Sequence, residues 1–210
     1  MPKNKRSLIL IGAGGHAHSC IDIIEQCADY DIAGLVGLPE EMHARHFGYS
    51  VIATDNDLQQ LVNEYQYAIV TAGQIQTADT RIRLYKQAEK VGFKIPAIVA
   101  PSANVSQHAT IDAGTMVMHG AMINAGARVG VNCIINTSSL VEHDVRVEGH
   151  CHISTGAILN GDVVVGAGSF VGSGSIIKEG VSLGDDCVVG MGLSVRYNIK
   201  ANTRLVGNNK

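Results

Sequence analysis

The sequence has no tryptophan and few other aromatic residues: among 210 residues there are six tyrosines and three phenylalanines. A hydrophobic core must therefore be built mainly from Ile, Val, Leu and Ala. Charge of one sign is also lacking, since 16 Lys and Arg stand against 19 Asp and Glu, a formal net charge of −3. This balance provides no broad basic surface, so we expect no nucleic-acid partner.

Long apolar runs are absent too, and none approaches the roughly 20 residues that a transmembrane helix needs. A short basic segment precedes the apolar residues Ser7–Ile11, but this stretch ends at Gly12, too early for a secretory signal peptide. The five cysteines are an odd number, which without such a signal argues against a disulfide framework. We therefore expect a cytoplasmic protein with no membrane partner.

An aliphatic residue recurs at every sixth position from residue 99 to residue 200, without a break, and so opens seventeen consecutive hexads. This period predicts a parallel β-helix of triangular cross-section, of the left-handed class, with three hexads per coil. A β-sandwich would instead need alternation with a period of two. The openers are Val99, Val105, Ile111, Val117, Ile123, Val129, Ile135, Val141, Val147, Ile153, Leu159, Val165, Val171, Ile177, Leu183, Val189 and Val195.

The corners of the predicted coil are marked by residues that tolerate a positive φ angle, three places after each opener. The next place is usually small, and at Cys133, Cys151 and Cys187 we expect a reduced thiol that fills the interior. The corner residues are Gly114, Gly120, Gly126, Gly156, Gly168, Gly174, Gly180, Gly192, Asn132, Asn198, Asp144, Asp162 and Asp186.

Residues 7–96 differ from the coil, because apolar strands alternate there with amphipathic helices. Such alternation predicts a parallel sheet. We therefore expect two domains: an α/β domain of residues 1–98 and the β-helix of residues 99–210. The predicted strands are Ser7–Ile11, Ile32–Val36 and Ala68–Thr71, and the predicted helices are His16–Cys27, Asn56–Glu64 and Thr77–Val91.

The first strand runs into Gly12-Ala13-Gly14-Gly15-His16-Ala17, which satisfies the G-x-G-x-x-A pattern of Rossmann-like domains. Glycines there let backbone N–H groups approach a phosphate at the start of a helix. A site for NAD would also need an acidic residue at the end of the second strand, where this chain has Val36-Gly37-Leu38. NAD is therefore disfavoured, and another nucleotide or a nucleotide-sugar remains open.

The hexad period resembles that of the hexapeptide-repeat acyltransferases. With the glycine loop in front of it, and with the segments 136–143 and 160–163, the chain resembles the NeuD/PglD group of sugar acetyltransferases. The resemblance implies a homotrimer with active sites between neighbouring coils, acetyl-CoA as co-substrate, and a role in surface glycan or nonulosonic acid biosynthesis. PglD-type members N-acetylate a UDP-linked 4-amino sugar, whereas NeuD-type proteins are tied to O-acetylation or synthesis of sialic-acid-like sugars.

By motif position, the resemblance implies that Gly14, Gly15, His16, Gly73 and Asn136 contact the nucleotide-sugar. The usual Gly-x-Pro-Ala-Lys ending of the group is absent, which bears on one wall of the coenzyme A groove. An alternative of another class is therefore a non-catalytic trimeric scaffold or sugar-sensing module.

His143 is the predicted catalytic base. It takes an outward place in its hexad, and Glu142 and Asp144 flank it, so that either carboxylate could orient the ring. One coil later, 18 residues on, Gly161 stacks on the same corner, where its N–H could polarise a thioester carbonyl. A base and an oxyanion donor on one edge are what acyl transfer needs.

Contacts to coenzyme A are expected elsewhere on the coil. The resemblance places His152 near the thioester, whereas Ser173 and Met191, 18 residues apart on another corner, could line the pantetheine groove with their backbone amides. Metal catalysis is not expected: in His150-Cys151-His152 the strand period turns the cysteine inward and its neighbours outward.

Overall fold

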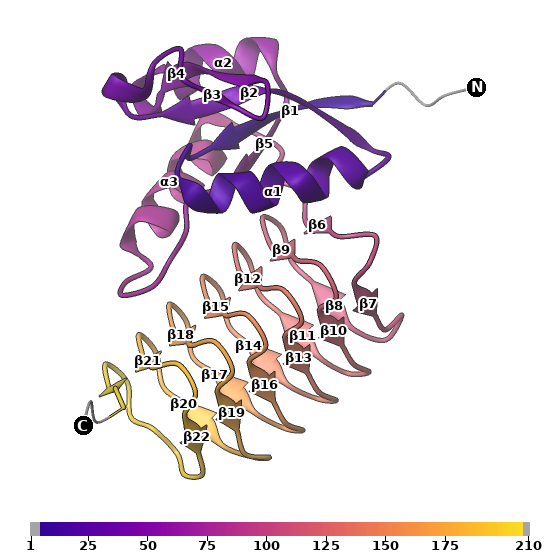
Figure 1. Cartoon of the computed structure of the whole chain (residues 1–210), viewed down its shortest axis with the longest axis vertical. Coiled ribbons are helices and arrows are strands. Elements are labelled where there is room, and N and C mark those ends of the chain that lie inside the picture. Colours follow the sequence, from indigo (N-terminus) through magenta and orange to yellow (C-terminus); the bar gives the residue numbers. More distant parts are fainter. Residues whose placement is uncertain (1–4, 208–210) are drawn as a thin grey trace.

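The apolar segment near the N-terminus forms the centre of a parallel sheet. In the computed structural model, which describes residues 5–207, β1 (Arg6–Ile11) lies between β2 (Tyr30–Gly37) and β5 (Tyr67–Val70) (Figure 1). Leu8 and Leu10 pack against α1 (Gly15–Gln26), whereas Ile9 and Ile11 pack against α2 (Leu58–Glu64) and α3 (Asp79–Val91). Both faces of β1 are therefore covered, as expected for a parallel strand.

One part of this domain was not predicted from the sequence. Between β2 and α2 lie a 3-10 turn η1 (Pro39–Glu41), the strands β3 (Arg45–His46) and β4 (Tyr49–Thr54), and a second 3-10 turn η2 (Asp55–Asp57). β3 and β4 form an antiparallel hairpin through a turn with positive φ at Phe47 and Gly48, and β4 extends the sheet beside β2. The surrounding polar residues concealed the alternation in β4, where Val51 and Ala53 are buried.

From residue 98 onward the chain winds into a left-handed parallel β-helix (Figure 1). Each strand pairs in parallel with a strand 18 residues away, for example Ile135 with Ile153, so the predicted coil period is confirmed. The strands are β6 (Ile98–Val99), β7 (Asn104–Val105), β8 (Thr110–Ile111), β9 (Met116–Val117), β10 (Met122–Ile123), β11 (Arg128–Val129), β12 (Ile134–Ile135), β13 (Leu140–Val141), β14 (Arg146–Val147), β15 (His152–Ile153), β16 (Ile158–Leu159), β17 (Val164–Val165), β18 (Phe170–Val171), β19 (Ile176–Ile177), β20 (Ser182–Leu183), β21 (Val188–Val189), β22 (Ser194–Val195) and β23 (Arg204–Leu205).

The coil has three faces. We call the sheet of β6, β9, β12, β15, β18, β21 and β23 the first face, that of β7, β10, β13, β16, β19 and β22 the second, and that of β8, β11, β14, β17 and β20 the third. Cys133, Cys151 and Cys187 are free and fully buried inside the prism. No helix in residues 5–207 is long and apolar enough to cross a membrane.

The predicted corners have positive φ angles with one exception. All of the predicted glycines, together with Asn132, Asp144, Asp162 and Asp186, lie in the left-handed region, but Asn198 does not. The hexad rhythm ends after Val195, and the positive φ moves to Asn202. Asn198 instead accepts a hydrogen bond from the backbone N–H of Ser182 through its side-chain oxygen, at 2.9 Å.

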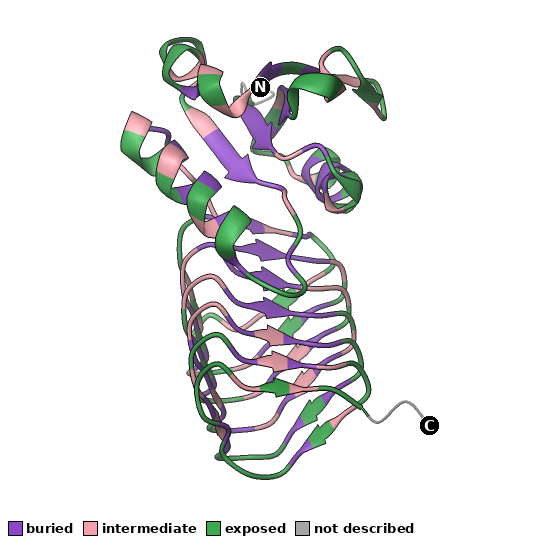
Figure 2. Cartoon of the chain, turned by 90° about the vertical axis from the view of Figure 1, so that its left-hand side faces the viewer, coloured by how far each residue is buried: buried purple, intermediate pink, exposed green. Residues whose placement is uncertain are grey.

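The α/β domain is fixed to the first face by a buried arginine. Arg81 of α3 has no exposed surface; its Nη1 donates to the carbonyl oxygens of Val70 (3.1 Å) and Ala72 (2.6 Å). Its Nη2 donates to the backbone and side-chain oxygens of Asn132, a corner residue of the coil, at 3.2 and 2.8 Å. Burial lowers the pKa of Arg81 to about 10, so the guanidinium stays charged at neutral pH. The upper coils under the domain are accordingly buried on this face (Figure 2).

This contact leads to a prediction on stability. Arg81→Met should lower the free energy of unfolding by about 2–4 kcal/mol, because several buried carbonyl oxygens lose their donor. Denaturant unfolding followed by circular dichroism measures the change. The matched control is Arg83→Met on the same helix: Arg83 is half exposed and pairs with Asp55 at the surface, so its loss should change stability by less than about 1 kcal/mol. Equal effects of the two variants would contradict the assignment.

Candidate active site

The glycine loop joins the end of β1 to the start of α1. Gly12 has a φ of +119°, and a Cβ on it would lie 2.6 Å from the backbone nitrogen of Ala72, so only glycine fits there. Gly14 and Gly15 have open space around them, and α1 begins without an acidic side chain in its first turn. The positive end of the helix is therefore accessible to an anion, as the sequence predicted.

A pocket of about 260 Å³ lies at the carboxyl ends of β1, β2 and β5. It is the place where ligands bind in open α/β sheets. Gly14 and Gly73, which the sequence placed in separate segments, both line it. We call it the glycine-loop pocket; its other lining residues are Gly12, Ala13, Val36, Gly37, Leu38, Glu41, Asp55, Ala72, Thr80, Arg83 and Leu84.

The sequence analysis missed an acidic residue in this pocket. Glu41 on η1 folds back over the end of β2, where its Oε2 accepts a hydrogen bond from the backbone N–H of Leu38 at 2.8 Å. A Cβ on Gly37 would lie 2.8 Å from the same oxygen. The expectation that no acid stands at the end of the second strand is therefore wrong in space. Pro39 followed two residues later by Glu41 has the pattern of a capped helical turn, a signal that could have revealed it.

Beyond Gly73 the pocket leads to a polar cluster on the first face, formed by His16, Gln74, Asn136 and His152. A Cβ on Gly73 would lie 3.4 Å from that of His16, and the ring of His16 lies 6.4 Å from the ring of His152. His152 Nδ1 donates to the backbone oxygen of Gln74 at 2.6 Å, and its Nε2 accepts from Asn136 Nδ2 at 3.0 Å. The predicted residues His16, Gly73, Asn136 and His152 are thus brought together. We call this group the polar junction.

The two histidines of the polar junction are held neutral. Burial, supported by the charge of Arg81, lowers the pKa of His16 to about 3. Burial also lowers the pKa of His152 to about 4, against the opposing effect of the hydrogen bond to Gln74. Within residues 5–207, His16 Nε2 and Gln74 Oε1 are buried without a hydrogen-bond partner. Both ring nitrogens of His152 are already used within the chain, and its role near a thioester stays a prediction.

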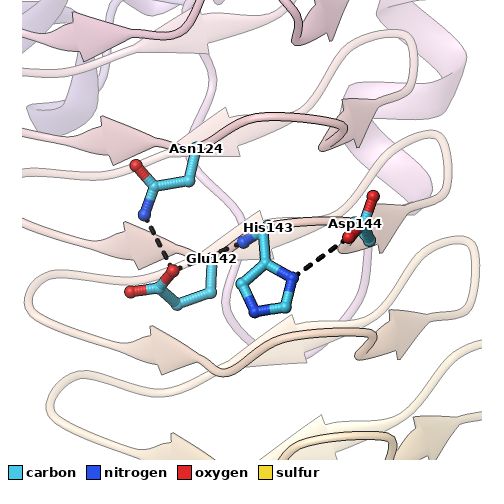
Figure 3. A network of polar contacts seen from close by, with 4 residues as sticks. All are labelled: Asn124, Glu142, His143 and Asp144. Carbon is cyan, nitrogen blue, oxygen red and sulfur yellow. Dashed lines mark hydrogen bonds and ion pairs between the residues drawn. The ribbon is translucent and has the colours of Figure 1, made fainter.

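His143 lies at the corner between β13 and β14, with Glu142 and Asp144 beside it (Figure 3). Its Nδ1 donates to Asp144 Oδ2 at 3.0 Å, which leaves Nε2 as the free basic nitrogen. This hydrogen bond raises the pKa of His143 above its ordinary value. Glu142 Oε2 instead accepts from Asn124 Nδ2 at 2.8 Å and from the backbone N–H of His143 at 3.4 Å. Asp144 orients the ring, and Glu142 holds the backbone.

Gly161 lies directly beneath the His143 ring, where the 18-residue period placed it. A Cβ at this position would lie 2.6 Å from His143 Cε1 and 2.7 Å from Nε2. Any side chain larger than hydrogen would therefore push the ring away. The ring side chain is 60% exposed, so its free nitrogen is open to a second molecule.

The predicted site residues occupy two different corners of one chain. Asn136 and, further along, Ser173 and Met191 lie between the first and second faces, whereas His143 and Gly161 lie between the second and third. Ser173 Oγ is 2.9 Å from Ser154 Oγ, and Met191 is 81% exposed. A side of the prism separates the two groups, on the order of 15–20 Å of extended chain.

The described residues 5–207 contain no group of three side chains that could hold a metal ion. In His150-Cys151-His152 the thiol points into the prism, and the pKa of Cys151 is raised by burial. His150 Nδ1 accepts a hydrogen bond from Asn132 at 2.9 Å. These residues connect the two domains.

Known proteins share both halves of this architecture. Residues 7–88 match the PglD N-terminal domain, and residues 162–196 match the hexapeptide repeat of succinyl-transferase. The acetyltransferase domain of PglB from Neisseria gonorrhoeae, solved with acetyl coenzyme A, is 29% identical, covers 98% of both chains and superposes with a TM-score of 0.88.

PerB from Caulobacter crescentus, solved with CoA and GDP-perosamine, is 30% identical over 97% of this chain and 95% of its own, with a TM-score of 0.89. WeeI from Acinetobacter baumannii, at 19% identity and a TM-score of 0.83, shares the fold. The identity to PerB extends over almost the full length of both proteins and includes the α/β domain as well as the coil. The chain therefore belongs to the hexapeptide-repeat sugar acetyltransferases of the PglD group.

Proposed function

We propose that the protein transfers the acetyl group of acetyl-CoA to the amino group of a nucleotide-linked amino sugar, in the cytoplasm and for surface glycan or nonulosonic acid synthesis. The observation that carries the proposal is the His143–Asp144 pair over Gly161. It provides an exposed basic nitrogen whose ring is oriented by a carboxylate, as general-base catalysis requires. The acetyl-CoA seen with PglB and the CoA seen with PerB support the choice of co-substrate.

The proposed reaction is a direct transfer. Nε2 of His143 takes a proton from the amine as its nitrogen attacks the thioester carbonyl carbon. The N–C bond forms, the C–S bond breaks, and the coenzyme A sulfur leaves as a thiolate that recovers the proton from the imidazolium. The N–H of Gly161 would stabilise the developing oxyanion. No covalent acyl-enzyme is needed, and the three coil cysteines are buried inside the prism.

The acceptor would bind along the glycine-loop pocket and the polar junction. Its diphosphate would lie against Gly14 and Gly15 at the start of α1, and its sugar near His16, Gly73 and Asn136. The unpaired polar atoms of His16 and Gln74 favour a polar group there. A UDP-linked 4-amino sugar is the form proposed from the sequence, and the GDP-perosamine held by PerB makes a GDP-linked amino sugar the second form to test.

The separation of the two corners supports a homotrimer with shared sites. A sugar held at Asn136 is too far from His143 of the same chain for proton transfer, so the base would come from the neighbouring copy. The second face also carries an apolar ladder of Met122, Leu140, Ile158 and Ile176, stacked in register. Its end members are 40% and 41% exposed, which favours burial against other copies.

His143→Ala should lower kcat by roughly 10²–10⁴, the usual contribution of a positioned general base. The side chain is exposed, so trimer formation and acetyl-CoA affinity should change little. The measurement is thiol release from acetyl-CoA with UDP- and GDP-linked amino sugars and with nonulosonic acids. His108→Ala, an exposed histidine on an earlier coil, is the control and should keep full activity.

Full activity of His143→Ala would place the base elsewhere. Release of thiol only with nonulosonic acids would favour O-acetylation of a sialic-acid-like sugar, and no release with any acceptor would favour the scaffold.

The pH profile should depend on Asp144. Because only neutral His143 accepts a proton, kcat/KM should rise with pH through its pKa, which Asp144 raises. Asp144→Asn removes the carboxylate, so the rising limb should move to lower pH while the plateau rate falls. Glu142→Gln should move the limb less, since Glu142 does not contact the ring. A larger shift for Glu142→Gln would reverse the roles of the two carboxylates.

Mixed trimers should test the shared site. Copies carrying His143→Ala and copies carrying Asn136→Ala, each inactive alone, should recover roughly a quarter of the wild-type activity when co-expressed in equal amounts, because a random ring then contains some intact sites. Two affinity tags verify that mixed trimers form. A mixture of His143→Ala with His143→Gln is the control and should stay inactive. Mixed trimers without recovery would mean that base and acceptor site belong to one copy.

A further inference from the structure

One carboxylate in the glycine-loop pocket has no role in the transfer described above. Glu41 lies at the end of β2 and lines the pocket, and only its Oε2 has a hydrogen-bond partner in the described part of the chain, the N–H of Leu38. Resting on the proposed function, we propose that Glu41 binds the ribose 2′-hydroxyl of the acceptor nucleotide.

The order of the strands gives the direction in which a nucleotide-sugar lies. The glycine loop follows β1, which is flanked by β2 on one side and by β5 on the other. The segment after β5 reaches the coil, where Gln74 Nε2 donates to the backbone oxygen of Gly168 at 3.1 Å and its own backbone oxygen accepts from His152. With the diphosphate at the glycine loop, the sugar extends toward β5 and the coil. The nucleoside therefore extends toward β2 and Glu41.

Of the two carboxylates that line the pocket, Glu41 is the one available to a ligand. Asp55 already forms an ion pair with Arg83 at 2.9 Å. In the described residues Glu41 pairs with no cation, and its Oε1 remains free to accept a hydrogen bond. An acidic side chain at the end of the second strand is the group that receives the ribose 2′-hydroxyl in Rossmann-like domains. Here it arrives through the fold of η1, four residues after the strand.

Tight packing fixes the position of this carboxylate. A Cβ on Gly37 would lie 2.8 Å from Glu41 Oε2, 3.0 Å from Val51 Cγ1 and 3.2 Å from the Cβ of Ala13. Glycine at position 37 therefore lets the carboxylate lie over the strand end, beside the glycine loop. The hydrogen bond from Leu38 holds one oxygen, so the side chain is already ordered before a ligand binds.

Calorimetric titration tests the proposal with four probes: UDP, GDP and their 2′-deoxy forms. The wild-type protein should bind at least one ribonucleotide about tenfold more tightly than its 2′-deoxy form. Glu41→Gln should weaken binding of that ribonucleotide by about tenfold and remove the difference between the two forms. The amide oxygen of Gln can still accept from Leu38, so the turn should be kept. Glu40→Gln, on the exposed neighbouring residue, is the control and should behave as wild type.

Gly37→Ala is a second variant that leaves Glu41 in the sequence but displaces its carboxylate, and it should reduce the preference for ribose in the same way, with folding checked by thermal melting. The proposal is overturned if Glu41→Gln binds as wild type, if ribo and deoxy forms weaken equally, or if neither nucleotide binds the wild-type protein.

Acetyl transfer, measured separately, distinguishes the two proposals. Transfer to a nucleotide-linked amino sugar with an unchanged KM in Glu41→Gln would refute only the role of Glu41. The expected binding pattern without any acetyl transfer would refute only the proposed function.

Discussion

Parallel pairing between residues 18 apart is the constraint on which the rest of this structure depends. Each strand has only two residues, so no strand could persist alone, and the coil is held by the stack of strands above and below it. The same pairing decides which side chains meet at the surface. It places His143 over Gly161 and keeps any larger side chain from that spot. A reactive group at such a corner is held by the whole stack, and its position does not depend on a long loop.

The histidines show how environment separates residues of one type into different roles. His16 and His152 are enclosed between two domains near the buried charge of Arg81, and both stay neutral well below physiological pH. They are suited to hydrogen bonding in a fixed orientation. His143 is open to solvent and its protonated form is stabilised by Asp144, so its pKa moves in the opposite direction. Only this ring combines a free nitrogen with a tendency to take up a proton.

The coil could be predicted almost completely from the sequence, because its signal is local and repeats seventeen times. The prediction failed at Asn198, where the rhythm ends and the chain turns by another route. The alternation of strands and helices in the first domain was also readable, since apolar periodicity reports burial. The proximity of His143 and Gly161 followed from the period alone, as did the inward thiols of the coil.

What could not be predicted depends on contacts between distant segments. The buried bridge of Arg81 to Asn132 joins residues 51 positions apart, and nothing in a helix rich in Lys and Arg marks one arginine as buried. Glu41 looked like one acid of a surface pair until the fold of η1 placed it over Gly37. The hydrogen bonds that unite Gln74, Asn136 and His152 likewise arise only when the two domains meet.

Two independent features of the coil agree on how copies would assemble. If the corner of Asn136 in one copy meets the corner of His143 in the next, rotation around a closed ring turns the side between these corners, the second face, toward the symmetry axis. That face carries the apolar ladder from Met122 to Ile176, whereas the third face has Arg128 and Arg146 in adjacent strands. The surface that the chemistry requires to be central is thus the surface that water favours burying. A site divided between copies would then be complete only in the assembly that the coil's own hydrophobic pattern stabilises.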